Sequence, residues 1–327
     1  MKRHNICKII FAILAVFLCV AFYELIGICI TYKKQPAVSD ATIKETQNIM
    51  SVAGRENTER AVIIEKNSQA LLERVRLIQN AKDEIILSTF AFKSDESGKL
   101  ILGALHDAAD RGVHVRILVD GMESWIDMEG NPYFYGLSSH ENVEIQLYNK
   151  ANQLKPGKTR GRMHDKYLIA DGKIYILGGR NTYNYFLGDF PGHKNFDRDV
   201  LVVCDEPQKD NSVNQLWNYF ETILEQVDCR YFHNSKKLAD RKSVKNAVLE
   251  LQEGYQQYFE VNKEKICDTD YADETFETEK IILLSNPIHT QAKEPVVWYQ
   301  LGELMKNAKE RVKIHTPYII CNDMMYN

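Results

Sequence analysis

The stretch RMHDKYLIADGKIYILGGRN, residues 162–181, decides the fold that the sequence predicts. Alternate side chains of a β-strand share a face, so we expect His164 and Lys166 to point one way and Asp165 the other. An imidazole then lies beside an ammonium group on one surface.

The second part of this stretch predicts a turn and a returning strand. Asp171-Gly172 is a strong signal for a two-residue hairpin turn, and residues 173–177 form the returning strand. Gly178 and Gly179 let a backbone approach a ligand closely, and Asn181 supplies an amide. We therefore predict a site that holds and attacks a phosphate.

A His-x-Lys pair on an exposed strand is most often an ordinary solvated face. The Gly-Gly-x-Asn group at a fixed offset lowers the chance of coincidence by roughly two orders of magnitude. The complete spacing resembles, without departure, the H-x-K-x4-D-x6-G-[GS]-x-N motif of the phospholipase D superfamily. It comprises His164, Lys166, Asp171, Gly178, Gly179 and Asn181.

Other segments extend this resemblance over about residues 68–224. Residues 108–121 resemble the helix and strand that precede the motif in that family. Residues 162–186, followed by FDRDVLVV at 196–203, are most similar to bacterial cardiolipin synthases, particularly the C type. The resemblance implies an α/β fold with a mixed sheet flanked by helices. Alternating helices and strands in the sequence favour the same fold class.

The resemblance also implies roles for the motif residues. His164 is the nucleophile that forms a phosphohistidine, or its acid partner, and Lys166 clamps the non-bridging phosphate oxygens. Asp171 orients a histidine, either His164 or that of a partner motif. Asn181 donates a further hydrogen bond to the phosphate. The remaining substrate-binding candidates are Gly178, Gly179 and Arg162.

No metal or other cofactor is expected. The only rival cluster is His193 with Asp197 and Asp199, which we interpret as polar loop and strand-start residues. The seven cysteines show no zinc spacing. A net charge of −4 and a pI near 6.2 predict no overall attraction to nucleic acid. The basic segment 150–166 is either a solvated loop or an attractor of anionic headgroups.

The N-terminus predicts a membrane segment. Residues 9–31 are apolar except for Glu24 and are long enough to span a bilayer. A cleaved signal peptide is the alternative, but its candidate site at residues 37–39 lies beyond two lysines and a proline. We favour an uncleaved single-pass anchor in the cell membrane. The lysines and arginine that flank the segment favour an external catalytic part only slightly. The side of the membrane on which the catalytic part lies therefore stays open.

The expected organisation has five parts. These are an anchor (1–31), a tether (32–60), a first phospholipase D-like half (61–230), a charged linker (231–275) and the incomplete start of a second half (276–327). Strands are expected at 84–92, 113–119, 143–149 and 199–205, and helices from Ser68, over 98–111 and over 211–225. One amphipathic linker helix carries Tyr255, Tyr258 and Phe259, which touch lipid or pack onto the domain.

An internal repeat supports the second half. NAKDEIILST (80–89) matches NAKERVKIHT (307–316), and the family is built from two such halves. The same offset places a second motif beyond Asn327, so we expect the chain to be truncated before it. The second motif would come from a continuation of the chain in cis or from a homodimer partner.

Three functions remain open at this point. The first is a membrane-anchored phosphatidyltransferase, a cardiolipin synthase acting on phosphatidylglycerol-type phospholipid. The second is a phosphodiesterase or nuclease that works as a one-motif homodimer. The third is a catalytically inactive, membrane-anchored interaction protein. The anchor and the acidic pI favour lipid, and no nucleic acid is expected as a partner.

Overall fold

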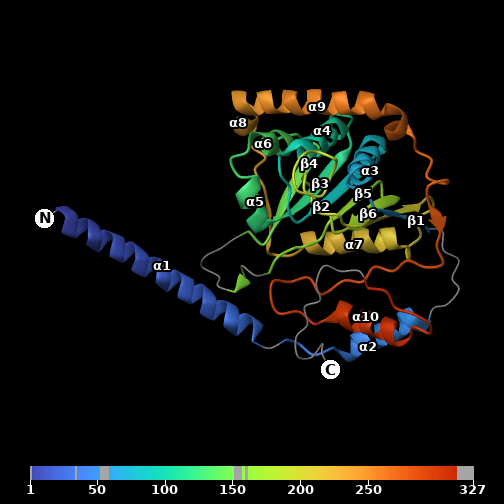
Figure 1. Ribbon diagram of the computed structural model, residues 1–327, viewed down its shortest axis with the longest axis horizontal. Helices are drawn as coiled ribbons and strands as arrows, with labels where there is room; N and C mark the ends of the chain where they lie inside the picture. The colour runs from blue at the N-terminus through green and yellow to red at the C-terminus, as the bar shows by residue number, and fades with distance from the viewer. Residues whose placement is uncertain (1, 34, 52–58, 151–156, 159–160, 315–327) are drawn as a thin grey trace.

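A mixed β-sheet lies at the centre of the protein (Figure 1). The computed structural model describes residues 2–33, 35–51, 59–150, 157–158 and 161–314. The sheet has the order β8-β4-β3-β2-β5-β6-β7-β1-β9, in which β2, β3 and β4 run parallel and the other neighbours antiparallel. The strands are β1 (Glu59–Ile64), β2 (Glu84–Thr89), β3 (His114–Asp120), β4 (Val143–Tyr148), β5 (Tyr167–Ala170), β6 (Ile174–Gly178), β7 (Asp199–Cys204), β8 (Cys229–Tyr231) and β9 (Phe276–Glu277).

Helices cover both faces of this sheet. α3 (Asn67–Asn80), α4 (Glu96–Asp110), α6 (Pro132–Ser138) and α9 (Lys242–Cys267) lie on one face, and α7 (Ser212–Leu224) lies on the other (Figure 1). Central strands supply both cores: in β3, Val115 and Ile117 enter the first core and Leu118 enters the second. Burial on both faces explains why these strands are continuous apolar runs. The predicted mixed sheet flanked by helices is confirmed.

The segment 231–275 is part of the domain and not a free linker, so that prediction is wrong. It contains α8 (Lys236–Ala239) and α9, whose Val244, Leu251 and Tyr255 are buried in the first core. α9 approaches α4 so closely that a Cβ on Gly103 would lie 2.6 Å from the Leu251 carbonyl oxygen. Tyr258 and Phe259 pack against the same core, which confirms the packing alternative for this helix.

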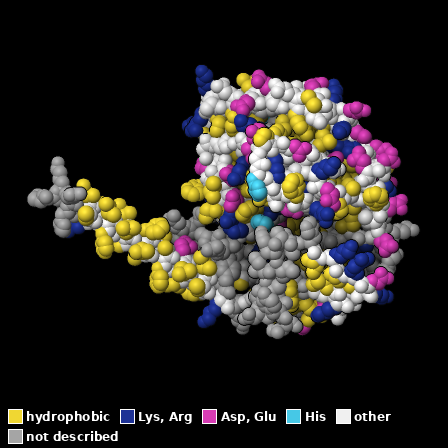
Figure 2. Space-filling view, in the orientation of Figure 1, with side chains coloured by type: hydrophobic (Ala, Val, Ile, Leu, Met, Phe, Trp, Pro, Cys, Tyr) yellow, Lys and Arg dark blue, Asp and Glu magenta, His cyan; other side chains and the backbone are white. Residues whose placement is uncertain are grey.

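The N-terminal helix α1 (Lys2–Tyr32) stands away from the domain (Figure 1). Within its residues 6–31 the most apolar 18-residue window has a mean hydropathy of 2.7, and none of that window is buried. Figure 2 shows hydrophobic side chains along its length, in contrast to the mixed surface of the domain. The helix is long and apolar enough to cross a membrane, and a signal sequence has the same properties.

The predicted irregular tether contains a helix, α2 (Asp40–Ser51). Glu294 accepts hydrogen bonds from the Ser39 backbone N–H, at 2.8 Å, and from the Thr42 hydroxyl, at 2.6 Å. α2 thereby lies beside α10 (Val296–Lys306), which comes from the predicted second half (Figure 1). Long-range contacts of this kind leave no local sequence signal.

Several predicted boundaries are wrong. The residue before α3 is Lys66, so Ser68 is not its cap. β2 ends at Thr89 and not at residue 92. Residues 307–314 form no strand, and Val312 and Ile314 are exposed there. A strand needs a paired neighbour, and none of the described strands pairs with this segment. The rest of the predicted second half, residues 315–327, lies outside the described residues.

Candidate active site

The hairpin forms as predicted, but its first strand starts later. Asp171 and Gly172 both have positive φ angles, 51° and 61°, and the Lys173 N–H donates to the Ala170 carbonyl at 3.0 Å. The turn lies where the sequence predicts it, but Ala170 pairs with Ile174, so three residues form the loop and not two. β5 begins at Tyr167, so His164 and Lys166 precede the strand in an extended segment.

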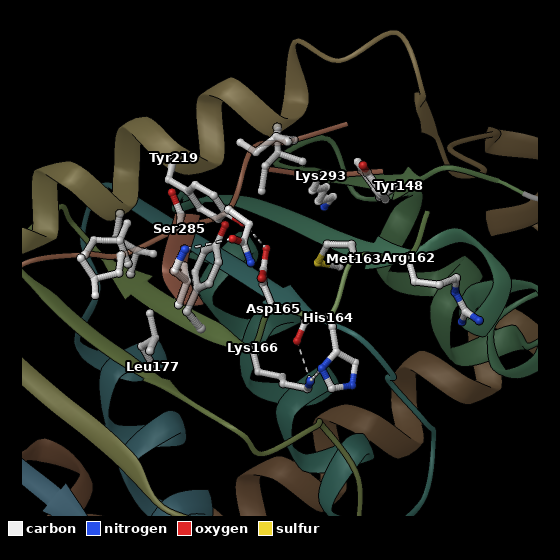
Figure 3. A pocket seen from close by; sticks show the side chains of 18 of the residues that line it. Tyr148, Arg162, Met163, His164, Asp165, Lys166, Leu177, Tyr219, Ser285 and Lys293 are labelled. Atoms are coloured by element: carbon white, nitrogen blue, oxygen red, sulfur yellow. Dashed lines mark hydrogen bonds between the residues drawn. The ribbon is translucent and has the colours of Figure 1, made fainter. Parts of the chain in front are cut away.

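His164 and Lys166 lie together on one side of this segment (Figure 3). The Lys166 Nζ is 2.9 Å from the His164 Nδ1 and also donates to the His164 carbonyl oxygen. The Phe90 ring contacts the imidazole, with 4.6 Å between ring centroids. Asp165 points the other way and accepts a hydrogen bond from the Tyr219 hydroxyl at 2.8 Å. The predicted division of these side chains between two faces is confirmed.

Burial lowers the pKa values of both Lys166 and His164, which suits them to react with an anion. Desolvation lowers the pKa of Lys166 to about 8, against the attraction of Asp165 and Asp197. Desolvation and then the positive charge of Lys166 lower the pKa of His164 below its usual 6.5. At neutral pH the imidazole is therefore neutral, as a nucleophile must be, while most of the lysine keeps its charge.

Asp120, which we did not predict, holds the histidine segment in place. It ends β3 and is 1 % exposed. Its Oδ2 accepts from the Met163 backbone N–H at 3.1 Å, and its Oδ1 accepts from Arg162 Nε at 2.8 Å. Its position at the carboxyl end of a parallel strand, before Gly121, was the available signal.

Arg162 is already paired. Its guanidinium lies 2.7 Å from Asp120 Oδ1 and donates to Glu123 Oε1 at 2.9 Å. The same group lies over the Phe90 ring, 5.0 Å from the centroid. This arrangement orients Arg162 toward α5 (Gly121–Asp127), so its binding of a substrate phosphate stays a prediction.

Gly178 and Gly179 make room for carboxylates, and the close approach of a ligand to their backbone stays a prediction. A Cβ on Gly178 would lie 2.0 Å from Asp199 Oδ1, and one on Gly179 would lie 2.0 Å from Asp197 Oδ2. Asp199 is buried between the guanidinium groups of Arg74, at 2.9 Å, and Arg180, at 3.3 Å. The charge of Asp197 raises the pKa of Lys166, against the effect of burial.

Asp171 has a different role from the predicted one. Its carboxylate accepts hydrogen bonds from the backbone N–H groups of residues 82, 83 and 84, at 2.8–3.0 Å. It thus joins the hairpin turn to the start of β2, at the opposite end of β5 from His164. The prediction that Asp171 orients His164 is wrong, because this residue stabilises the hairpin; its action on the histidine of a partner motif stays a prediction.

Asn181 is 7 % exposed and follows β6 near the end of β2. Its Oδ1 accepts from the Ala91 backbone N–H at 3.1 Å, which fixes the orientation of the amide. Among the described residues no acceptor takes a hydrogen bond from its NH2 group. That group stays available for the predicted bond to a phosphate oxygen.

A cavity of about 390 Å³ lies beside the motif, between α7 and residues 283–297. Asp165, Tyr219 and Lys293 line it, as Figure 3 shows. Burial raises the pKa of Asp165 and lowers that of Lys293, and each opposes the shift of the other. In the part of the chain that the structure describes, no cluster of three or more His, Cys, Asp or Glu side chains could hold a metal ion.

Known proteins share this domain. Residues 75–224 match the family model described as "Cardiolipin synthase, PLD-like domain". An uncharacterized protein of Helicobacter pylori is 29 % identical over 292 residues, covering 81 % of this chain and 55 % of that protein. Cardiolipin synthase C of Escherichia coli is 29 % identical over 154 residues, covering 43 % of this chain and 31 % of that protein.

Among solved structures, the phosphatidylserine synthase of Haemophilus influenzae aligns with a TM-score of 0.46 and 16 % identity. The alignment covers 68 % of this chain and 48 % of the synthase chain. The curated relatives are longer, and this chain matches about half of the first of them. The matched segment contains the sheet from β2 to β7 and the complete histidine motif. Residues 75–224 therefore form a phospholipase D-like domain.

Proposed function

We propose that this chain provides one catalytic half of a membrane-anchored phosphatidyltransferase, a cardiolipin synthase that acts on phosphatidylglycerol-type lipid. One observation supports it above the others: the Lys166 Nζ lies 2.9 Å from the His164 Nδ1, and the pKa values of both groups are lowered. A neutral imidazole next to a positive charge is suited to attack a phosphodiester anion.

The contact between these groups defines the first step. A protonated lysine can only donate, so the His164 Nδ1 accepts from it and the ring proton lies on Nε2. An arriving phosphate replaces Nδ1 as the acceptor of the Lys166 proton. The imidazole proton can then move to Nδ1, which leaves Nε2 with a free electron pair facing the phosphorus.

The covalent step follows from this arrangement. The His164 Nε2 forms a bond to phosphorus while the bond from phosphorus to the glycerol oxygen breaks. The leaving oxygen takes a proton from a general acid, and Lys166 stabilises the charge on the phosphoryl oxygens. In the second step a hydroxyl of another phosphatidylglycerol attacks phosphorus, gives its proton to the now deprotonated general acid, and releases His164. We propose that the general acid is the histidine of a second motif, from the rest of a longer protein or from a second copy.

Two properties favour lipid as the substrate. The apolar helix α1 can hold the domain at a membrane, where phospholipid is concentrated. The chain has a net charge of −4, which gives no general attraction to the phosphates of nucleic acid.

The test uses membranes from cells that express the natural protein, supplied with labelled phosphatidylglycerol. We expect cardiolipin and free glycerol from the wild type and neither from His164→Ala. His114→Ala is the matched control, because His114 is exposed at the opposite end of β3 from Asp120. Equal cardiolipin formation by His164→Ala would refute the proposal. Cleavage of single-stranded DNA by the wild type, without lipid transfer, would favour the nuclease alternative.

A further inference from the structure

Two large apolar side chains are exposed beside the site. Trp125 and Ile126 are adjacent on α5, and each is 62 % exposed. Adjacent exposed apolar side chains are suited to a surface that meets another apolar phase. By contrast, the other two tryptophans, Trp217 and Trp298, are partly buried.

α5 is fastened to the histidine segment. The Asp120 carboxylate caps the helix by accepting from the Met122 and Glu123 backbone N–H groups, at 3.0 and 3.3 Å. The same carboxylate, together with Glu123, binds Arg162. Arg162 is two residues from His164. A surface that contacts α5 therefore lies close to the nucleophile, His164.

Two described residues between β4 and the histidine motif, Lys150 and Gly157, lie beside α5 and α1. A Cβ on Gly121, the first residue of α5, would lie 2.6 Å from the Lys150 Cα. A Cβ on Gly157 would lie 2.7 Å from the Gly27 carbonyl oxygen in the last turns of α1. The last turns of α1 thus lie beside Gly157, and the first residue of α5 lies beside Lys150. Figure 1 shows α5 on the side of the domain toward which α1 extends.

We propose that Trp125 and Ile126 form a membrane-contact surface that inserts into the lipid interface on the side of α1 and brings His164 to the phosphodiester layer. This proposal rests on the membrane location in the proposed function. Tryptophan prefers the interfacial region, where its ring is half-immersed and its N–H stays hydrated. The isoleucine beside it adds apolar area, and its insertion into lipid removes no charged group from water.

The experiment measures the depth of Trp125 directly. The full chain is reconstituted in vesicles of phosphatidylglycerol and phosphatidylcholine, part of which is brominated at defined acyl positions. The difference in fluorescence between the wild type and Trp125→Phe isolates the emission of Trp125. We expect bromine to quench this emission, most strongly at shallow acyl positions. We also expect the emission to be blue-shifted relative to that of the protein without lipid or detergent at the same pH.

A matched control places tryptophan on the opposite edge of the sheet. Phe276 in β9 is 73 % exposed and lies at the far end of the strand order from β8 and β4. In Trp125→Phe/Phe276→Trp, we expect no quenching by the brominated lipids. Lack of quenching at Trp125, or equal quenching at both positions, would overturn the proposal.

This measurement does not use activity, so it separates the two ideas. Quenching of Trp125 in a protein without lipid transfer would keep the membrane-contact surface and remove the proposed function. Lipid transfer without quenching of Trp125 would do the reverse. Trp125→Ser/Ile126→Ser adds a kinetic check, with KM for vesicle lipid expected to rise more than kcat falls.

Discussion

The lowered pKa of Lys166 predicts that anion binding fails in mild alkali. The phosphate has to attract a protonated lysine, and Lys166 has a pKa of about 8 instead of the usual 10.5. Binding follows the protonated fraction of the free protein, which is one half at that pKa. One pH unit higher, about one lysine in eleven is protonated, so affinity at pH 9 is about five- to sixfold weaker than at pH 8.

The assay titrates the chain with diethyl phosphate, whose single charge is constant over this range, and follows the His164 imidazole signals by NMR. His164 does not disturb the comparison, because its pKa is below 6.5 and the ring stays neutral from pH 8 upward. Lys166→Arg is the informative variant, since guanidinium keeps its charge throughout. Its affinity is expected to be independent of pH between 8 and 10, whatever its absolute value.

An affinity that stays constant from pH 7 to pH 10 in the wild type would refute this reasoning. It would mean that Lys166 has an ordinary pKa, or that it does not bind the phosphate. A loss of affinity in Lys166→Arg with the same midpoint as the wild type would assign the titration to another group.

Three further predictions concern the surroundings of this pair. Asp120→Asn removes a charge that raises the pKa of His164, so NMR titration should show a lower imidazole pKa. The variant also loses the charged hydrogen bond from the Met163 N–H to the carboxylate, which should reduce the free energy of unfolding by about 1.5–3 kcal/mol. An unchanged pKa would contradict the role given to Asp120. The charge of Asp197 raises the pKa of Lys166, and Gly179→Ala should displace Asp197. The pKa of Lys166 should therefore fall, and the alkaline loss of affinity should move to lower pH. The overpacking should also reduce the free energy of unfolding, measured in urea, by about 1–3 kcal/mol. Excess EDTA should leave lipid transfer unchanged, because the assigned groups are all organic, and recovery of lost activity by added divalent ions would contradict this.

The sequence predicts the central strands and the hairpin because local rules determine them. The Asp171-Gly172 turn needs two positive φ angles, and the flanking residues alternate or run apolar as buried strands do. His164 and Lys166 share a side because they are two residues apart in an extended segment. Such features depend on near neighbours in the chain, so one sequence is enough to find them.

The missed features depend on contacts between distant residues. Asp120 meets Met163 across 43 positions, and Asp171 meets Lys82 across 89, so no local pattern reveals either bond. The packing of the glycines was also missed, since only the fold shows that Asp197 fills the space beside Gly179. α9 has the charged composition of a linker, but its buried stripe packs against helices far earlier in the sequence.

The central claim is that His164 becomes covalently phosphorylated, and trapping the intermediate tests it most directly. The natural protein would be mixed with phosphatidylglycerol labelled on phosphorus, quenched in alkali within the first turnover, digested and mapped by mass spectrometry. We predict an acid-labile phosphatidyl group on the imidazole of the His164 peptide, absent from His164→Ala and present in His114→Ala. Turnover without any adduct, or an adduct on another residue with His164 unmodified, would contradict the assignment.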